Sequence, residues 1–354
     1  MTYFLQKDKM GKERIKSLDF LKGIAIFLVF VGHAICRCHA DAYNDRFFNY
    51  IYSFHMPLFM FISGYFSFKL VNNWNDIKKK FYQLVVPVIA YSIIAGFIFY
   101  GEYHVSKFVD ILLNPENGLW FFQVLFYISV FYILANLFYN KVLGRFHVHI
   151  RLDLYYVIIM LLGFGISSLL AIYFKKHNIE SDFGTPLFSK HCIFYLSGLL
   201  TKLHWDWIRP FLLKVVWSSI PIWFILATFF GFEHRPTFID HPNIILETVY
   251  YYVTGFAGIT MALSLAIRFV KQESNNSFVN TFTYLGTITL GLYAVHSAFL
   301  MKLVSLVVLP FNLNYWFSLF IVTFVSLLLS ILVVKILEKG ILSQQLLLGK
   351  TRIN

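Results

Sequence analysis

Stretches of about 20 largely apolar residues recur along almost the whole chain, and this pattern restricts its fold more than any other feature. Short polar segments separate ten such stretches. They cover residues 18–36, 48–69, 81–100, 119–139, 154–174, 188–203, 211–230, 246–268, 282–303 and 315–336. All but the short sixth stretch are long enough to cross a bilayer as an α-helix. The sequence therefore predicts an all-α, polytopic integral membrane protein with about ten transmembrane helices.

Composition agrees with a bilayer environment. Of 354 residues, 58% are hydrophobic and 14% are charged, whereas soluble domains are about half apolar and a quarter charged. This balance excludes a soluble enzyme, a disordered chain and a disulfide scaffold. The net charge of +12 is spread between the apolar stretches. We therefore expect membrane lipids as a partner and no nucleic acid.

The cysteines do not indicate a structural framework. An odd number, Cys36, Cys38 and Cys192, argues against paired disulfides. Cys36, Cys38 and His39 follow His33 and are residue types that bind metals. However, only His33 and Cys36 share a helix face, so we expect no metal site.

The distribution of basic residues predicts the orientation in the membrane. Ten crossings place both termini on one side, and with that side inside, 22 of the 30 Lys and Arg residues lie at inner ends. Inner loops carry this excess in membrane proteins, so we expect both termini in the cytoplasm. No small-residue cleavage site follows the first stretch, which favours an uncleaved helix over a signal peptide. The expected organisation is a basic N-terminal segment (1–17), a single membrane domain (18–338) and a short tail (339–354), with no soluble catalytic domain at either end.

Three ionisable residues lie in the first stretch, where their insertion is costly and usually functional. Lys22 and His33 are 11 residues apart, which places them on nearly the same helix face and about 16 Å apart along the axis. Asp19 precedes Lys22 by three residues, so the two can pair. The alternatives are that Asp19 and Lys22 anchor the helix at the interface and that His33 only packs. Gly32 would let another backbone approach closely, which favours a site.

Two further histidines are expected at the same depth as His33. His55 lies in the outer half of the second stretch, and His296 lies in the ninth, together with Tyr293. Pro57 is expected to kink the second helix. His55 therefore belongs either to a site or to the capping of a carbonyl that the kink frees.

The membrane interfaces supply the remaining candidates. Trp120 opens the fourth stretch and is either a belt aromatic or a substrate contact. Lys78, Lys79 and Lys80 precede the third stretch. They are either part of the inner positive charge or a cationic mouth for a cofactor that carries phosphate groups.

Several segments together resemble the membrane acyltransferase-3 family, and the resemblance covers nearly the whole chain. Lys22 and His33, within residues 18–33, look like the family's opening motif. The other matching segments are His55-Met56-Pro57-Leu58-Phe59 with Ser63-Gly64-Tyr65, Leu119-Trp120-Phe121-Phe122, Phe194-Tyr195-Leu196-Ser197-Gly198 and Leu290-Gly291-Leu292-Tyr293-Ala294-Val295-His296. The chain departs from the family where two arginines often precede the third helix, because Lys80 and Gln83 stand there.

The resemblance implies a stand-alone O-acetyltransferase of the bacterial cell (inner) membrane. Such enzymes move an acetyl group, commonly from acetyl-CoA, to a hydroxyl of a cell-surface or envelope glycan or of a lipid-linked saccharide precursor. A sugar hydroxyl needs a base near neutral pH, and histidine suits that task. His33 is therefore either the general base or an acylated relay.

These arguments give each candidate a role. The predicted catalytic residues are His33, Lys22 and Asp19, with the charged pair at the channel mouth. The predicted cofactor-binding residues are Lys78, Lys79 and Lys80. The predicted substrate-binding residues, among which are the candidate oxyanion donors, are His55, Trp120, Tyr293 and His296.

Two other functions are compatible with a polytopic chain. A transporter or flippase for polysaccharide precursors would carry charged residues in several spans and often shows pseudo-repeats. Here the ionisable residues concentrate in one helix. The other alternative is a structural or sensory membrane protein without chemistry.

Overall fold

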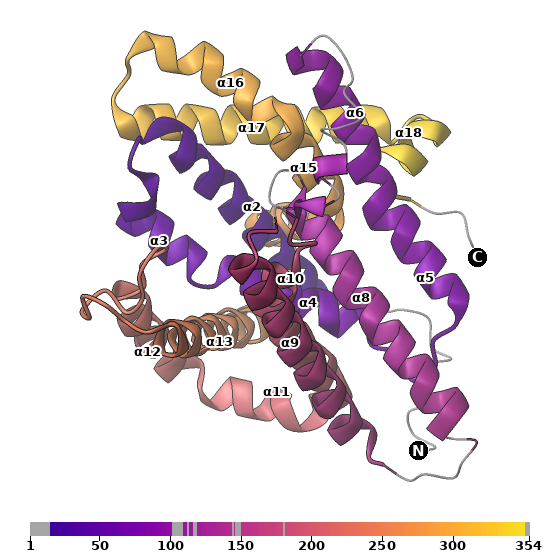
Figure 1. The fold of residues 1–354 in the computed structure, drawn as a ribbon. Coiled ribbons are helices and arrows are strands. Elements are labelled where there is room, and N and C mark those ends of the chain that lie inside the picture. The colour runs from indigo at the N-terminus through magenta and orange to yellow at the C-terminus, as the bar shows by residue number, and fades with distance from the viewer. Residues whose placement is uncertain are drawn as a thin grey trace.

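The computed structural model describes residues 15–100, 109–111, 113–115, 119–143, 145, 150–179 and 181–350. These residues form an all-helical bundle, with no strand among them (Figure 1). The longer helices, in chain order, are α2 (Lys16–Cys38), α4 (His55–Ser67), α6 (Val86–Tyr100), α8 (Trp120–Phe138), α9 (Leu152–Lys176), α10 (Thr185–Leu203), α11 (Trp205–Lys214), α12 (Val216–Thr228), α13 (Ile244–Phe269), α14 (Ser277–Thr287) and α17 (Tyr315–Leu337). Of the basic segment expected at residues 1–17, residues 1–14 lie outside the described residues.

Shorter helical elements connect these helices. They are α3 (Arg46–Tyr52), α5 (Trp74–Lys80), α15 (Thr289–Val295), α16 (Met301–Val308), α18 (Ile341–Leu346), the 3₁₀ turns η1 (Ala42–Asn44) and η6 (Leu309–Phe311), and the π-helical segments η2 (Phe81–Val85), η4 (Tyr139–Leu143) and η5 (His296–Leu300). π-Helical turns occur often at functional sites.

Six described helices are long and apolar enough to cross a membrane. They are α2, the continuous run Trp74–Ile98, Trp120–Lys141, α9, α13 and α17. Two bent pairs raise the number to eight if each is one span: α11 with α12, bent by 77°, and α14 with α15, bent by 69°. The structure thus supports six to eight candidate spans and does not by itself establish ten.

The two remaining apolar stretches, 48–69 and 188–203, fold differently from simple spans. The first is divided into α3 and α4 at Ser53 and Phe54. The expected kink at Pro57 is therefore misplaced: Pro57 lies in the first turn of α4, where a missing N–H group costs little. The second forms the 19-residue helix α10, which carries Lys190 and Lys202 among its polar residues and does not qualify by hydropathy.

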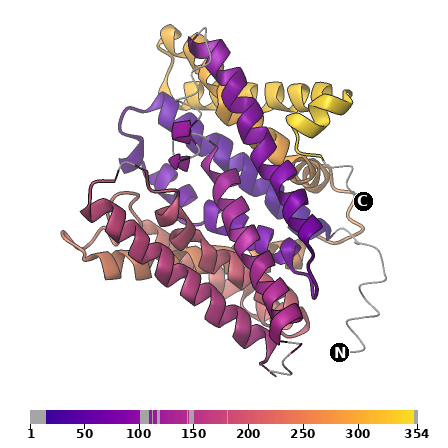
Figure 2. The ribbon, with the colours of Figure 1, turned by 45° about the vertical axis from the view of Figure 1, so that its right-hand side comes forward.

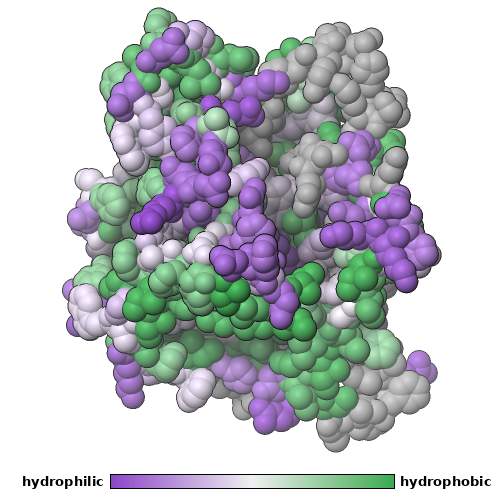
Figure 3. Space-filling view, turned by 60° about the vertical axis from the view of Figure 1, so that its left-hand side comes forward, coloured by the Kyte–Doolittle hydropathy of each residue, from purple (hydrophilic) through white to green (hydrophobic). Residues whose placement is uncertain are grey.

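Much of the exterior is apolar. On α9, large hydrophobic side chains such as Leu161, Ile166 and Leu169 are exposed, and α17 exposes Phe320 and Leu328 in the same way. Figure 3 shows one face of the molecule, where broad hydrophobic areas border gathered hydrophilic side chains. Surfaces of this kind fit contact with lipid tails.

Two close helix pairs build the centre of the bundle. In the pair of α4 and α10, an added Cβ at Gly64 would collide with the carbonyl of Tyr195, and one at Gly198 with the carbonyl of Phe61. In the pair of α2 and α14, Gly23 and Gly286 lie against each other's helix backbone in the same way. Small residues let membrane helices approach closely, so these glycines fix the positions of α2 and α4. Figure 2 shows the chain end with α18 beside α6.

Candidate functional site

The centre of the bundle brings histidines from different helices together. The ring centroids of His33 on α2 and His296 at the start of η5 are 5.3 Å apart. The ring of Phe30 stacks on His296 at 4.4 Å. His33 is partly exposed, whereas His296 is fully buried, and its Nε2 atom has no hydrogen-bond partner among the described residues. A buried polar atom of this kind indicates a missing partner such as a substrate or water.

His55 joins this cluster through Tyr52. The Nδ1 atom of His55 lies 2.8 Å from the carbonyl oxygen of Ile51, which also accepts a hydrogen bond of 3.3 Å from the N–H group of Phe54 at the break between α3 and α4. The ring of His55 lies 4.6 Å from that of Tyr52, and Tyr52 in turn packs against Gly32 beside His33. His55 thus combines the capping role with a place in the cluster. We call His33, His55 and His296 the histidine cluster.

Aromatic rings separate the histidine cluster from a cavity beside Lys22 of α2, which we call the inner cavity. Tyr293 lies one turn before His296, and their ring centroids are 5.6 Å apart. Phe121 and Phe122 of α8 contact Tyr293 at 5.4 and 5.2 Å. Phe121 also lines the cavity, so a single aromatic layer stands between the cavity and the histidines.

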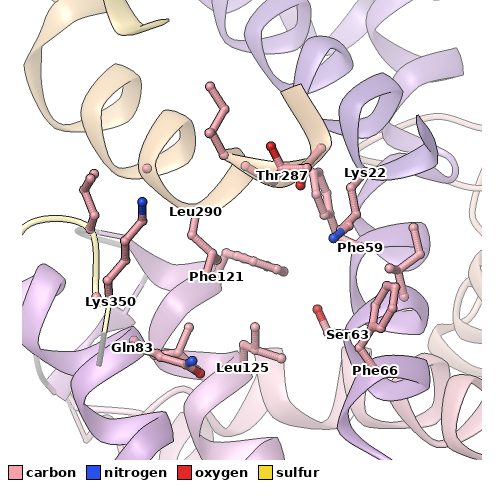
Figure 4. Close-up of a pocket in the computed structure, with 18 of the residues that line it drawn as sticks. Lys22, Phe59, Ser63, Phe66, Gln83, Phe121, Leu125, Thr287, Leu290 and Lys350 are labelled. Carbon is pink, nitrogen blue, oxygen red and sulfur yellow. Dashed lines mark hydrogen bonds between the residues drawn. The ribbon is translucent and has the colours of Figure 1, made fainter. Parts of the chain in front are cut away.

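This inner cavity has a volume of about 370 Å³. It is enclosed by α2, α4, η2, α8, the break between α14 and α15, and the C-terminal segment. Its polar lining includes Lys22, Ser63, Gln83 and Lys350, which Figure 4 labels, and Lys80 at the end of α5. A cavity of this size is within the range of small-molecule sites.

The charges around the inner cavity are predominantly positive. Lys22 pairs with Asp19, a carboxylate that is 5% exposed, at 2.5 Å, and lies over the ring of Phe66 at 4.8 Å. Lys80 donates a hydrogen bond to the Ser67 hydroxyl at 3.2 Å. Lys350 pairs with Glu338 at 2.8 Å, and both line the cavity. With Asp19 and Glu338 counted, three lysines face two carboxylates, and the remaining positive charge attracts an anion.

Some predicted site residues lie elsewhere. Lys78 and Lys79 share α5 with Lys80 but do not line the inner cavity. Trp120 stacks on His191 of α10 at 5.2 Å, and the buried His191 has no hydrogen-bond partner for its Nδ1 atom in the part of the chain that the structure describes. Among the described residues, no group of three His, Cys, Asp or Glu side chains is arranged to hold a metal ion.

The structure also adds residues that the sequence did not indicate. Ser63, Glu338 and Lys350 line the inner cavity, yet Lys350 reaches it only because Gly349 packs against Gln83. No local pattern near the chain end signals this contact. His191 offered a signal, because it is a histidine within an apolar stretch.

Comparisons with known proteins agree with the sequence motifs. The sequence profile of a family described as an acyltransferase domain, Acyl_transf_3, matches residues 15–335. The nodulation protein NolL of Mesorhizobium japonicum is 26% identical over 223 residues, which cover 60% of this chain and 54% of that protein. NolL of Sinorhizobium fredii is 49% identical over 53 residues, 14% of each chain. The match thus spans about half the length of the first relative. No solved structure gives a significant match.

Proposed function

Because the chain belongs to the acyltransferase-3 family, we propose that it is a membrane O-acyltransferase that takes acetyl groups from cytoplasmic acetyl-CoA. The acceptor is a hydroxyl of a cell-surface or envelope glycan or of its lipid-linked precursor. The family match supports acyl transfer, and the sequence motifs support an acyl-CoA donor.

One observation carries the proposal: the lysine-lined inner cavity ends one aromatic layer below the histidine cluster. Lys22, Lys80 and Lys350 offer charged donors to the phosphate groups of acetyl-CoA. The pantetheine arm is long and thin, so it suits a path past Phe121 and Tyr293. The thioester would then reach His33 and His296 while the phosphates stay on the inner side.

The chemistry assigned to the cluster is general-base catalysis. His33 accepts the proton of the acceptor hydroxyl while its oxygen forms a bond to the thioester carbonyl carbon. Tyr293 is the proposed oxyanion donor, because its hydroxyl can donate a hydrogen bond and its ring lies 5.6 Å from that of His296. The Nδ1–H group of His296 donates to the carbonyl of Leu292, so the Nε2 atom of the neutral ring can only accept a hydrogen bond. The carbon–sulfur bond then breaks, and the proton held by His33 passes to the thiolate of coenzyme A. In the alternative, His33 itself carries the acetyl group between donor and acceptor.

We further propose ten crossings, with both termini in the cytoplasm of a bacterial cell. α10 and the pair of α3 and α4 supply the two crossings beyond the six helices and two bent pairs. In this orientation, 22 of the 30 Lys and Arg residues lie at inner ends, which supports it. Both named relatives come from bacteria. A cysteine at Arg145 and one at Ser181 should label from opposite sides of the membrane; labelling from the same side would contradict the ten-span arrangement.

Inverted membrane vesicles, which expose the cytoplasmic side, give a direct test of the function. Vesicles that contain the full-length protein receive acetyl-CoA labelled in the acetyl group. We expect label in the extracted glycan and lipid-linked saccharide fractions, and no such label with His33→Ala at equal protein level. Unlabelled fractions with the wild-type protein would refute acyl transfer. Acid quenching without acceptor distinguishes the relay, because a labelled protein would reveal an acetylated histidine.

A further inference from the structure

A second cavity lies on the opposite side of the histidine cluster and has no part in the function proposed so far. It has a volume of about 410 Å³ and lies between residues 43–50 and residues 227–240. In the ten-span arrangement both segments are at outer ends. We call this space the outer cavity. Its lining includes Tyr43, Arg46, Tyr50, Glu233 and Asp240.

The two walls of the outer cavity are held together by a buried amide. Asn49 is 9% exposed. Its Oδ1 atom accepts a hydrogen bond from the N–H of Phe232 at 2.9 Å, and its Nδ2 atom donates to the carbonyl of Tyr43 at 3.0 Å. The hydroxyls of Tyr50 and Thr228 are hydrogen-bonded at 3.0 Å. The cavity is therefore preformed, which reduces the entropy cost of binding a ligand.

The lining combines aromatic rings with carboxylates. Tyr43 stacks on Phe232 at 4.8 Å, and Tyr50 borders the same space. Aromatic rings suit the apolar C–H face of a sugar ring, whereas carboxylates accept hydrogen bonds from its hydroxyls. Glu233 and Asp240 outnumber Arg46 among the ionised side chains of the lining. The field thus favours a neutral sugar over an acidic one.

The outer cavity is connected to the catalytic residues by one aromatic ring. The ring of Tyr52 lies 5.4 Å from that of Phe232, which lines the cavity, and 4.6 Å from that of His55. Tyr52 also contacts Gly32, the neighbour of His33. A saccharide held in the outer cavity would therefore be separated from His55 by the rings of Phe232 and Tyr52.

From these contacts we propose that the outer cavity binds the acceptor as a neutral saccharide and presents its hydroxyl to His33. This inference rests on the proposed function and adds the acceptor class to it. The inner cavity then serves the anionic donor, and the two substrates approach the histidines from opposite sides.

The test measures saccharide binding and acyl transfer separately on the full-length protein in nanodiscs. Saturation-transfer NMR without acetyl-CoA probes chitotetraose, mannotetraose and maltotetraose as neutral ligands and tetragalacturonate as an acidic one. We expect binding of at least one neutral probe and weaker binding of tetragalacturonate. Glu233→Gln combined with Asp240→Asn should weaken neutral binding about tenfold, since each removes a charged acceptor. The acetyl-CoA KM should stay unchanged.

His241→Gln is the matched control, because His241 is exposed on the same loop but does not line the cavity. Tyr43→Ala is a second cavity variant that removes an aromatic wall without changing charge. Failure of every neutral probe to bind would overturn the inference, as would unchanged binding in both cavity variants. If these variants transfer acyl groups with an unaltered KM for the acceptor, the inference about the outer cavity fails, whereas the proposed function stands. Saccharide binding without any acyl transfer would instead refute the proposed function.

Discussion

The inner and outer cavities are similar in volume but differ in charge and construction. The inner cavity of about 370 Å³ is lined by three lysines and one carboxylate, whereas the outer cavity of about 410 Å³ is lined by Arg46, Glu233 and Asp240. In our proposal, the opposite charges of the two cavities sort the two substrates, with the anionic donor at the lysine-lined cavity and the uncharged acceptor at the other.

The two cavities are also built from different kinds of backbone. The inner cavity uses interrupted helices, namely η2 and the break between α14 and α15 at Ile288. The outer cavity uses the turn before α3 and the loop after α12, joined by the Asn49 amide. A helix break exposes polar backbone inside a bundle, where it must face a cavity or another partner. The loop can instead vary in sequence without disturbing the bundle.

Substitution of His33 should have the largest effect, because it separates catalysis from binding at the two cavities. We expect His33→Ala to lower the rate of acyl transfer by about 10²–10⁴-fold, because a general base contributes this much. Binding of acetyl-CoA to the inner cavity and of saccharide to the outer cavity should persist. Transfer rates measured with vesicles at matched protein levels check this. Near-normal transfer would move the base role to His55 or His296, and His33→Gln controls for lost volume.

A comparison of two neighbouring lysines tests the inner cavity. Lys80 lines it and Lys78 does not. Lys80→Gln should raise the KM for acetyl-CoA about tenfold through loss of a charged phosphate contact. Lys78→Gln is the matched control on the same helix and should leave this KM unchanged. Equal effects of the two variants in steady-state kinetics would indicate a general surface field instead of a cavity contact.

A substitution in the inner cavity should also strengthen its attraction for acetyl-CoA. Gln83 lines it where members of the family often carry an arginine, so Gln83→Arg adds a cation beside Lys80. We expect the KM for acetyl-CoA to fall about fivefold at low ionic strength, and less in high salt because the interaction is screened. The acceptor KM should not change. A rise in the donor KM would show that the added side chain fills space that the donor needs.

The smallest expected effect concerns the pair of Lys350 and Glu338. The two side chains are 51% and 31% exposed, so their attraction is weak. Glu338→Gln should free Lys350 to contact the donor and lower the KM for acetyl-CoA about two- to threefold. Lys350→Gln should shift the KM in the opposite direction. Steady-state kinetics with varied acetyl-CoA detects both changes in KM, and shifts of the same sign would argue against competition for Lys350.

The sequence predicted the class of fold and the depth of its key side chains well. Apolar stretches located the long helices, and distance along the chain placed His33 and His296 at one level before the structure brought them to 5.3 Å. It also misplaced features that depend on packing. Pro57 begins a helix instead of kinking one, since the break occurs upstream at Ser53. Hydropathy within a stretch does not reveal where backbone hydrogen bonding is interrupted.

Contacts between distant segments were beyond sequence reasoning. Lys350 reaches the inner cavity through the fold of the chain end, and the outer cavity joins segments about 180 residues apart, as the hydrogen bond from Phe232 to Asn49 shows. The sequence also did not reveal what the glycines in the family motifs contact. Gly64 and Gly198 lie near the candidate residues in sequence, but their place in the structure is the contact between α4 and α10. They position the site from a distance.

The π-helical segment η5 limits where residues can be inserted or deleted, because it sets the rotation of α16 about its axis. It starts at His296 and widens the helix before α16, where Met301 and Val304 are buried while Leu303 and Leu306 are exposed. Each residue advances an α-helix by about 100°. Deletion of one residue between His296 and Met301 would keep the histidine but rotate all of α16 by that angle, so its exposed side would turn toward the bundle. Insertions and deletions here are therefore constrained by register, even where single substitutions are tolerated.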